Sequence, residues 1–291
     1  MKKILIILIA FLFIACEQKE QKPLVLSVDR WIGASPIYYA HKKGWLKDIG
    51  IEMILAPSIA DNLHLYRLKV SDIVTGTQHE FFKLKKDSLD IKPFLIYDRS
   101  YGGDVIMANR TLKEFQNSSQ MIHVYLELGT INEEMLNFWK LYNEIADERL
   151  ILHNATQDEI SNQIVRENQE PLLLITYNPH NIALKKSGFY QIADSMDDRY
   201  LVLDSLFTSD KVYKERGEDL KNLKTVLLKA TMAYEKDAKE YYETIKGYIS
   251  NPSYEEFKDM QKNIRWLLDS KKSDSIYKAM ESMSFPHKDL L

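Results

Sequence analysis

The sequence contains one cysteine in 291 residues, Cys16. A single thiol excludes an internal disulfide, a zinc site built from several cysteines and a dithiol redox pair. Histidine is sparse as well, because the seven histidines are scattered and none has metal-ligand spacing such as His-Glu-x-x-His. Ser35 and Ser100 lack the setting of a nucleophile elbow. The sequence therefore predicts no metal centre, no cofactor and no enzymatic activity.

Basic residues are not in excess. The chain has 39 lysines and arginines against 42 aspartates and glutamates, a net charge of −3. Loss of Lys2 and Lys3 with an N-terminal signal would leave −5. A mildly acidic protein is a poor candidate for binding nucleic acid or an anionic membrane surface.

Long apolar runs are also absent after residue 14. Residues 4–14 are an unbroken apolar run behind Lys2 and Lys3, about half of the roughly 20 residues needed to cross a bilayer. Phe13-Ile14-Ala15-Cys16 resembles the bacterial lipobox, with phenylalanine at the usual leucine. We therefore expect residues 1–15 to be a lipoprotein signal peptide and 16–23 a lipidated Cys16 and tether. A plain signal peptide with an incidental cysteine is the alternative.

The body of the chain alternates strands with helices. Short apolar runs bounded by polar or glycine-containing segments predict strands. Alternation of this kind predicts an α/β fold with mostly parallel sheets and helices on both faces. The predicted strands are 24–28, 51–55, 73–74, 93–97, 105–108, 121–126, 150–152, 172–176, 190–193 and 200–203.

Helix starts are predicted from capping residues. Ser35 precedes Pro36 as an N-cap, Asp61 and Asn132 are further N-caps, and Ser253 with Glu256 forms a capping box. Helical spacing of apolar residues predicts an apolar stripe over 135–146, a helix through 160–165, one long helix with a stripe over 220–245, and another through 257–267. From residue 209 onward the chain is expected to be helical.

Polar segments follow most of the predicted strands. In sheets of this kind, ligands bind at the carboxyl ends of the strands. The stretch 98–104, Asp-Arg-Ser-Tyr-Gly-Gly-Asp, has two glycines that allow a close approach of backbone or ligand. The polar segments that follow predicted strands are 31–36, 76–80, 100–104, 127–130, 154–156, 177–179 and Asp204.

These segments, in this order, resemble the substrate-binding proteins of ABC importers of the nitrate/sulfonate/taurine and thiamine-pyrimidine type. The resemblance implies a two-lobed periplasmic-binding-protein fold of type 2, with a ligand cleft between the lobes and a helical C-terminal region. Lobe one would comprise 24–100 and 205–291, and lobe two 101–204. The matching residues are Gly33-Ala34-Ser35-Pro36, Tyr38, Ala40, Lys43-Gly44-Trp45-Leu46, Asp98 to Asp104, Glu127-Leu128-Gly129, Asn154-Ala155-Thr156, Tyr177-Asn178-Pro179 and Asp204.

The resemblance further implies a lipid-anchored monomer outside the cytoplasm that delivers a small solute to permease and ATPase subunits. A ligand-sensing lipoprotein that signals to a membrane receptor would use the same cleft and stays an alternative. Enzymes of similar fold that make the thiamine pyrimidine carry a cysteine-rich motif, which this sequence lacks.

Three carboxylates fall on expected cleft positions, Asp104, Glu127 and Asp204. They favour a ligand with an amine, since they would repel an anion. Arg30 and Arg99 favour an oxyanion instead, and Ser35 at the start of its helix could also receive one. Either arginine could equally pair with a neighbouring aspartate, Asp29 or Asp98. Asp104 could merely shape its turn, Asp204 could be a cap, and Trp31 and Tyr38 could be core residues. The candidate ligand-binding residues are Trp31, Ser35, Tyr38, Thr77, Ser100, Gly103, Asp104, Glu127, Asn154, Tyr177, Asn178 and Asp204.

Overall fold

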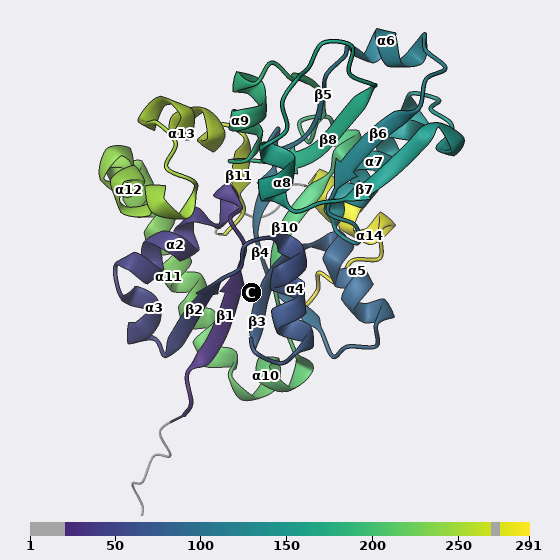
Figure 1. The fold of residues 1–291 in the computed structure, drawn as a ribbon. Coiled ribbons are helices and arrows are strands. Elements are labelled where there is room, and N and C mark those ends of the chain that lie inside the picture. Colours follow the sequence, from purple (N-terminus) through teal and green to yellow (C-terminus); the bar gives the residue numbers. More distant parts are fainter. Residues whose placement is uncertain (1–20, 269–273) are drawn as a thin grey trace, which may run out of the picture.

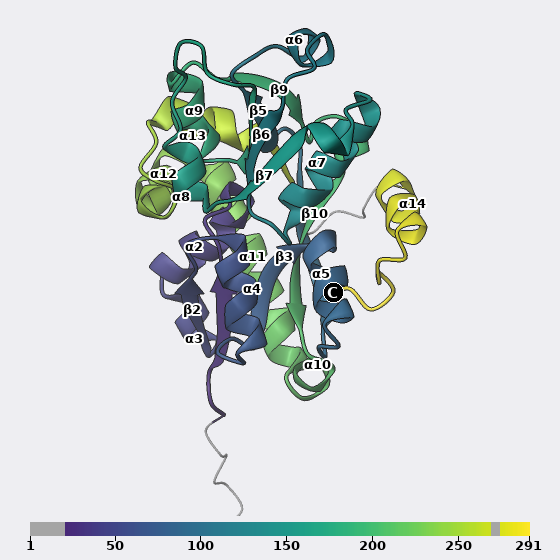
Figure 2. The ribbon, with the colours of Figure 1, turned by 45° about the vertical axis from the view of Figure 1, so that its right-hand side comes forward.

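The computed structural model describes residues 21–268 and 274–291 as a two-lobed α/β protein (Figure 1). The predicted signal peptide and Cys16 lie outside these residues. Each lobe contains one β-sheet with helices on both faces, as Figures 1 and 2 show. The predicted α/β class and two-lobed fold are confirmed.

Lobe one is built on a six-stranded sheet in the order β11-β4-β10-β3-β1-β2. β1 pairs in parallel with β2 and β3, whereas β10 is antiparallel to β3 and β4, and β11 is antiparallel to β4. The strands are β1 (Leu24–Val28), β2 (Ile51–Leu55), β3 (Ile73–Thr77), β4 (Lys92–Ser100), β10 (Val202–Thr208) and β11 (Ile264–Trp266).

Helices cover the two faces of this sheet with separate cores. Side chains of α2, α11, α12 and α13 pack on one face, and those of α4, α5 and α14 pack on the other. The helical segments are η1 (Ile32–Ala34), α2 (Ser35–Lys42), α3 (Trp45–Asp48), α4 (Ile59–Arg67), α5 (Gln78–Lys86), α10 (Asp210–Glu215), α11 (Gly217–Lys236), α12 (Ala238–Ile245), η4 (Lys246–Tyr248), α13 (Tyr254–Gln261) and α14 (Asp274–Ser282).

Lobe two is built on a five-stranded sheet in the order β7-β6-β8-β5-β9. β6 is parallel to β7 and β8, and β5 is antiparallel to β8 and β9. Both sheets are thus mixed, so the prediction of mostly parallel sheets is wrong. The strands are β5 (Asp104–Ala108), β6 (Ile122–Leu126), β7 (Leu150–Asn154), β8 (Leu172–Tyr177) and β9 (Tyr190–Asp194).

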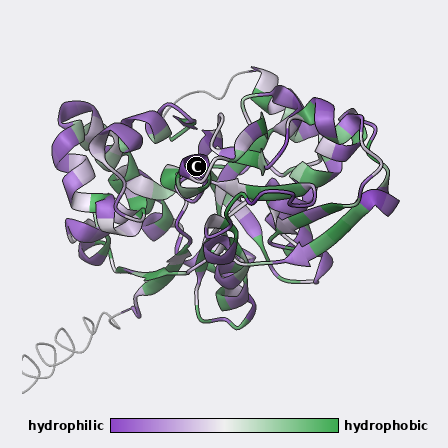
Figure 3. Ribbon diagram, turned by 45° about the horizontal axis from the view of Figure 1, so that its top comes forward, coloured by the Kyte–Doolittle hydropathy of each residue, from purple (hydrophilic) through white to green (hydrophobic). Residues whose placement is uncertain are grey.

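Alternation along β5 separates the two cores of lobe two. Ile106 and Ala108 pack with α6 and α7, whereas Val105 and Met107 pack with α8 and α9, because successive side chains of a strand point to opposite faces. Figure 3 shows the resulting apolar strands between more hydrophilic helices. The helical segments are α6 (Leu112–Gln116), α7 (Ile131–Tyr142), η2 (Asp147–Arg149), α8 (Gln157–Ser161), α9 (Asn181–Lys186) and η3 (Asp198–Tyr200).

The chain crosses between the lobes twice within residues 98–104 and 194–204. β4 belongs to the first sheet and β5 to the second, with only residues 101–103 between them. The return runs from β9 through η3 into β10. Paired strands at such crossings suit a hinge between lobes.

Three helix starts differ from the predictions. Ser58, not Asp61, caps α4, and Thr130, not Asn132, caps α7. In both helices the true cap adopts an extended conformation and accepts a backbone N–H with its hydroxyl. Ser35 is the first residue of α2 and makes no capping bond, because η1 leads directly into the helix.

Several element ends also differ. β10 continues to Thr208, and the predicted helix 160–165 ends at Ser161. The predicted stripe over 135–146 also runs past the end of α7 at Tyr142. The single long helix is two, because the chain breaks at Asp237, whose side chain caps α12. The helix predicted through 257–267 ends at Gln261, and Ile264 lies in β11 instead. The capping box of Ser253 and Glu256 is confirmed.

Across residues 21–268 and 274–291, no helix has the length and hydropathy of a membrane span.

Candidate functional site

The stretch 98–104 forms the first crossing. The hydroxyls of Ser100 and Ser195 lie 2.6 Å apart, and each accepts a backbone N–H: Asp104 N donates to Ser100 Oγ over 3.1 Å and Gly102 N to Ser195 Oγ over 2.9 Å. Gly102 has a φ of 99°, which favours glycine. Ser100 therefore ties the two crossings together.

Asp98 and Asp204 face each other across these crossings. They are partners in the register of β4 and β10, and both are buried. Trp31 Nε1 donates to Asp98 Oδ2 over 3.0 Å, whereas Asp98 Oδ1 and Asp204 Oδ2 have no partner among the described residues. Burial raises the pKa of Asp98 to about 7, and burial with the charge of Asp98 raises the pKa of Asp204 well above its usual value. Two adjacent buried carboxyl groups cannot both ionise without a nearby cation.

Three further buried carboxylates lie near this pair, Asp29, Asp104 and Glu127. Burial raises the pKa of Asp29 to about 6 and those of Asp104 and Glu127 to about 7. The charge of Asp29 adds to the increase at each of the other four carboxylates, so these four lie within electrostatic range of Asp29. We call these five residues, Asp29, Asp98, Asp104, Glu127 and Asp204, the acidic cluster.

Glu127 forms the lobe-two end of the acidic cluster. Gln157 Nε2 donates to Glu127 Oε2 over 2.8 Å, and Glu127 Oε1 has no partner within the described residues. Gln157 is itself held by Thr176, whose hydroxyl donates to Gln157 Oε1 over 2.6 Å. Besides Gln157, the hydroxyl of Ser58 and the backbone of Ala60 also lower the pKa of Glu127, so its side chain is held from both lobes.

Two aromatic rings line the acidic cluster. The rings of Trp31 and Tyr177 lie 6.1 Å apart at 81°, and both side chains are buried. Glycines permit this packing, because a Cβ on Gly103 would lie 2.3 Å from Trp31 Cη2 and one on Gly33 only 1.8 Å from Asp98 Oδ2. The Tyr177 hydroxyl has no partner in the described chain. Besides burial, the charges of Glu127, Asp29 and Asp104 raise the pKa of Tyr177, so the ring lies beside the acidic cluster.

Other predicted residues have their polar atoms engaged by the protein. Tyr38 donates to the carbonyl oxygens of Asp29 and Trp31 and so supports that loop. Ser35 Oγ accepts from Tyr241, and Thr77 caps α5. Asn154 Oδ1 accepts from Leu128 N over 3.0 Å at the lobe-two surface.

Asn178 lies at the boundary of the lobes. Its backbone N donates to Gly103 O over 2.9 Å, and its Nδ2 has no partner among residues 21–268 and 274–291. It lines a cavity of about 210 Å³ between α9 and α13, together with Asn181 and Met260. A second cavity, of about 300 Å³, lies between α4 and α5 of lobe one and Leu128 and Gly129 of lobe two. Both cavities lie where the two lobes meet.

The two arginines that could favour an oxyanion, Arg30 and Arg99, differ in their partners. Arg99 pairs with Asp198 at 2.6 Å and stacks over Tyr101, so it is engaged away from the acidic cluster. Arg30 forms no ion pair with any described residue, and its charge adds to burial in lowering the pKa of His180, which falls to about 4. Within the described part of the chain, no group of three or more His, Cys, Asp or Glu side chains is placed to hold a metal ion.

The sequence analysis missed four of the residues gathered here: Asp29, Asp98, Gln157 and His180. Asp29 directly follows β1, so the strand-end rule could have found it. Asp98 lies within the stretch 98–104, but the sequence suggests it only as an ion-pair partner of Arg99. Gln157 and His180 carry no signal in the sequence that separates them from other polar residues.

Comparisons with known proteins place this arrangement in a known fold. No family model matches the sequence, and no curated protein matches it. A ligand-binding component of an ABC-type import system from Staphylococcus aureus has a TM-score of 0.71 at 12% identity, covering 93% of this chain and 96% of that chain.

Two further solved structures agree. The periplasmic aliphatic sulphonate binding protein SsuA from Escherichia coli has a TM-score of 0.70 at 10% identity, covering 91% of this chain and 86% of its own. The periplasmic nitrate-binding protein NrtA from Synechocystis PCC 6803 has a TM-score of 0.62 at 13% identity, covering 81% and 69%. The expected periplasmic-binding-protein fold is confirmed, and these similarities concern the fold alone.

Proposed function

We propose that this protein captures a small organic solute that carries a cationic amine or amidine, binding it between the lobes. The observation that carries the proposal is the acidic cluster. Its five carboxylates are buried, the charge of Asp29 reaches the other four, and Asp98 and Asp204 each have an oxygen without a partner in the described residues. A buried carboxylate without a counter-charge is costly, so a cationic ligand would supply what the chain does not.

The surroundings of the acidic cluster fit such a ligand. Trp31 and Tyr177 present aromatic rings beside the carboxylates, which suits a cation–π contact. The free hydroxyl of Tyr177 could accept or donate a further hydrogen bond. A sulfonate or nitrate would meet five carboxylates here, and Arg99 is engaged elsewhere. The oxyanion alternative therefore rests on Arg30, because Ser35 accepts a hydrogen bond from Tyr241.

We further propose that the protein serves an ABC importer as its lipid-anchored capture subunit, attached through Cys16 outside the cytoplasm. Lobe one would comprise 24–100 with 205–291, and lobe two 101–204. The similar fold of a ligand-binding component of an ABC-type import system supports this role. A sensor lipoprotein would use the same site, and stimulation of a permease–ATPase complex by the protein would separate the two roles.

Native mass spectrometry of the purified protein tests the ligand class. We expect a co-purified amine or amidine, and a sulfonate or nitrate would contradict the proposal. The molecule identified would then be titrated by calorimetry against Asp104→Asn. Loss of one cluster carboxylate should weaken binding tenfold or more, about 1.4 kcal/mol. The control is Asp48→Asn, which changes an exposed aspartate of α3 outside the acidic cluster.

The anchor has its own test. Cys16→Ala should move the protein from the membrane fraction to the soluble fraction, because the thiol would be the site of lipid attachment. Unchanged partitioning into detergent would contradict the lipid anchor and leave the ligand proposal untouched.

A further inference from the structure

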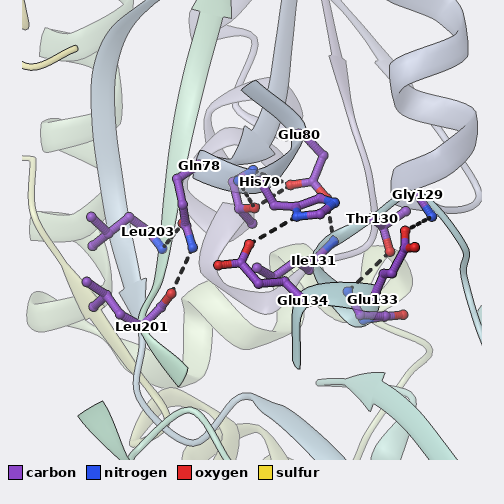
Figure 4. Close-up of polar contacts among 12 residues, drawn as sticks. Gln78, His79, Glu80, Gly129, Thr130, Ile131, Glu133, Glu134, Leu201 and Leu203 are labelled. Atoms are coloured by element: carbon purple, nitrogen blue, oxygen red, sulfur yellow. Dashed lines mark hydrogen bonds and ion pairs between the residues drawn. The ribbon is translucent and has the colours of Figure 1, made fainter. Parts of the chain in front are cut away.

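Two helix N-termini meet across the lobe boundary beside the acidic cluster. α5 of lobe one begins at Gln78, and α7 of lobe two begins at Ile131. Figure 4 shows His79 and Glu80 directed toward Ile131 and Glu134. These contacts join residues about 50 positions apart in the sequence and use side chains that the acidic cluster does not.

Glu80 makes the most buried of these contacts. Its Oε2 accepts from Thr77 N over 2.7 Å and thereby caps its own helix, while its Oε1 accepts from Ile131 N of the other lobe over 2.6 Å. The N–H of Ile131 is among those that a helix N-terminus leaves unpaired, and the helix dipole favours a carboxylate there. Because Glu80 is fully buried, this charge-assisted bond is shielded from water.

His79 and Glu134 form an ion pair across the same boundary. Nδ1 of His79 lies 3.0 Å from Oε2 of Glu134, and both side chains are about one quarter exposed. Burial alone would lower the pKa of His79, but the hydrogen bond to Glu134 and the charges of Glu80, Glu134 and Glu133 raise it above its usual value. These three glutamates, one on α5 and two on α7, are the charged groups that face His79.

Gln78 connects the same helix end to the second crossing. Its Nε2 donates to Leu201 O over 2.8 Å, and Leu203 N donates to its Oε1 over 2.9 Å. Three consecutive residues thus contact a crossing strand and a helix of lobe two. A movement of lobe two about the crossings would break the contacts of His79 and Glu80 while the contacts of Gln78 could persist.

We propose that His79 and Glu80 form a latch that holds the lobes together without ligand and weakens as the pH rises. The ion pair is strongest with His79 protonated, so its contribution is complete below the ordinary histidine pKa and is lost as the pH passes through the raised pKa of His79. These are positioning residues, since they act through the arrangement of the lobes. The latch does not depend on the proposed function, because it needs no ligand.

The chain offers a matched control within one turn of helix. Glu133 precedes Glu134 on α7, but its Oε2 accepts from Gly129 N over 3.0 Å within lobe two. Glu133→Gln and Glu134→Gln remove the same charge from neighbouring positions. Only the second change breaks a contact between the lobes.

Interlobe distances measured by double electron–electron resonance test the latch. Spin labels would be attached at Lys47→Cys in lobe one and Lys113→Cys in lobe two, both exposed. Cys16→Ala makes the labelling specific, because no other cysteine is present. The protein would be unfolded, dialysed and refolded to remove any bound solute.

At pH 6 we expect Glu134→Gln and His79→Gln to raise the ratio of open to closed lobes roughly threefold. An effect of this size is typical of the loss of a partly exposed ion pair. Glu133→Gln should raise the ratio less than Glu134→Gln, because it only lowers the pKa of His79 and breaks no contact between the lobes. Glu80→Gln should have a larger effect, because a glutamine offers one acceptor where Glu80 uses two. If this buried variant fails to fold, Glu134→Gln and His79→Gln decide the matter.

The pH dependence separates the latch from the acidic cluster, whose carboxylates also titrate. The wild-type protein should open as the pH rises from 6 to 8.5, and His79→Gln should lose the part of this change that His79 supplies. Equal pH responses in the two proteins would overturn the role of His79. Equal effects of Glu133→Gln and Glu134→Gln at pH 6 would overturn the latch itself.

Discussion

The lobe boundary has an acidic centre, the acidic cluster, and an acidic edge, where α5 meets α7. The two regions differ in how their carboxylates are paired. At the α5–α7 edge, Glu80, Glu133 and Glu134 each accept a bond from a helix N-terminus or a histidine. In the acidic cluster, Asp98 and Asp204 each keep an oxygen without a partner in the described residues.

The difference lies in the donors that each region supplies. Helix N-termini provide free N–H groups and a favourable dipole at the edge. The crossing strands provide few, since most N–H groups of a strand pair with the next strand. The carboxylates of the edge are therefore paired within the protein, although Nε2 of His79 has no partner, whereas the centre lacks a paired cation among the described residues. Four changes test this contrast, beginning with the largest expected effect.

The stability of the ligand-free protein should fall as the pH rises toward 8. The folded protein keeps protons on Asp29, Asp98, Asp104 and Glu127 that the unfolded chain has released, so stability present near pH 4 is lost as these groups ionise up to about pH 7. A carboxyl group whose pKa is raised to about 7, as that of Asp104 is, changes the free energy of unfolding by on the order of 4 kcal/mol.

Urea unfolding of the refolded protein at pH 5 and 8 measures this loss. His180, whose pKa is lowered to about 4, acts in the opposite direction up to the ordinary histidine pKa. We therefore compare the wild-type protein with Asp104→Asn, in which this background is the same. The variant should lose less stability between the two pH values. If the wild-type protein lost no more stability than the variant between pH 5 and 8, Asp104 would already be paired with a positive charge in the protein.

Gly33→Ala should destabilise the centre through sterics rather than charge. A Cβ there would lie 1.8 Å from Asp98 Oδ2 and 2.3 Å from Trp31 Nε1, so the indole and the carboxyl group must both move. Overpacking of this kind costs about 1–3 kcal/mol, which chemical unfolding would register. Gly217→Ala, which meets no atom within 4 Å, is the control and should be neutral or slightly stabilising. Equal stability of the two variants would mean that Trp31 is not fixed against Asp98.

Most segments that form the lobe boundary can be predicted from the sequence, but the contacts between them cannot. The strand-end rule identified the segments of Asp104, Glu127, Tyr177 and Asp204, all of which lie at the lobe boundary. The two-residue period of a strand also predicts the positions of Asp98 and Arg99. Asp98 and Arg99 are adjacent in β4 and so point to opposite faces, which puts Asp98 inside and lets Arg99 reach Asp198.

The remaining contacts could not be predicted, because they join distant segments. Glu80 and Ile131 are 51 residues apart and meet only when the lobes come together. Likewise, three residues of β11 follow a helix and look helical in isolation, yet they form a strand because β4 offers a free edge. Tertiary pairing overrides local spacing in such short segments.

Tyr177→Phe should separate ligand binding from stability in the acidic cluster. The hydroxyl is buried without a partner in the described chain, so its removal should leave the free energy of unfolding unchanged or raise it by up to about 1 kcal/mol. Binding of the molecule identified by native mass spectrometry should weaken at the same time. Thermal unfolding and calorimetry on one preparation measure both quantities. A marked loss of stability would mean that the hydroxyl already has a partner within the protein.

The smallest effect is expected at the opposite edge, between α9 and α13. Lys186 and Glu256 also form an ion pair across the lobes, at 2.6 Å, but the lysine side chain is 68% exposed. Glu256 keeps its capping bond to Ser253 N without the lysine, so Lys186→Ala removes only a solvated contact. Such pairs contribute about 0–1 kcal/mol, and salt weakens them further. The interlobe distances should therefore change less in Lys186→Ala than in Glu134→Gln, and the difference should persist at high salt because the His79–Glu134 pair is less exposed than the Lys186–Glu256 pair. If Lys186→Ala opened the lobes as far as Glu134→Gln, burial would not be what distinguishes the two edges, and the latch would be a property of interlobe ion pairs in general.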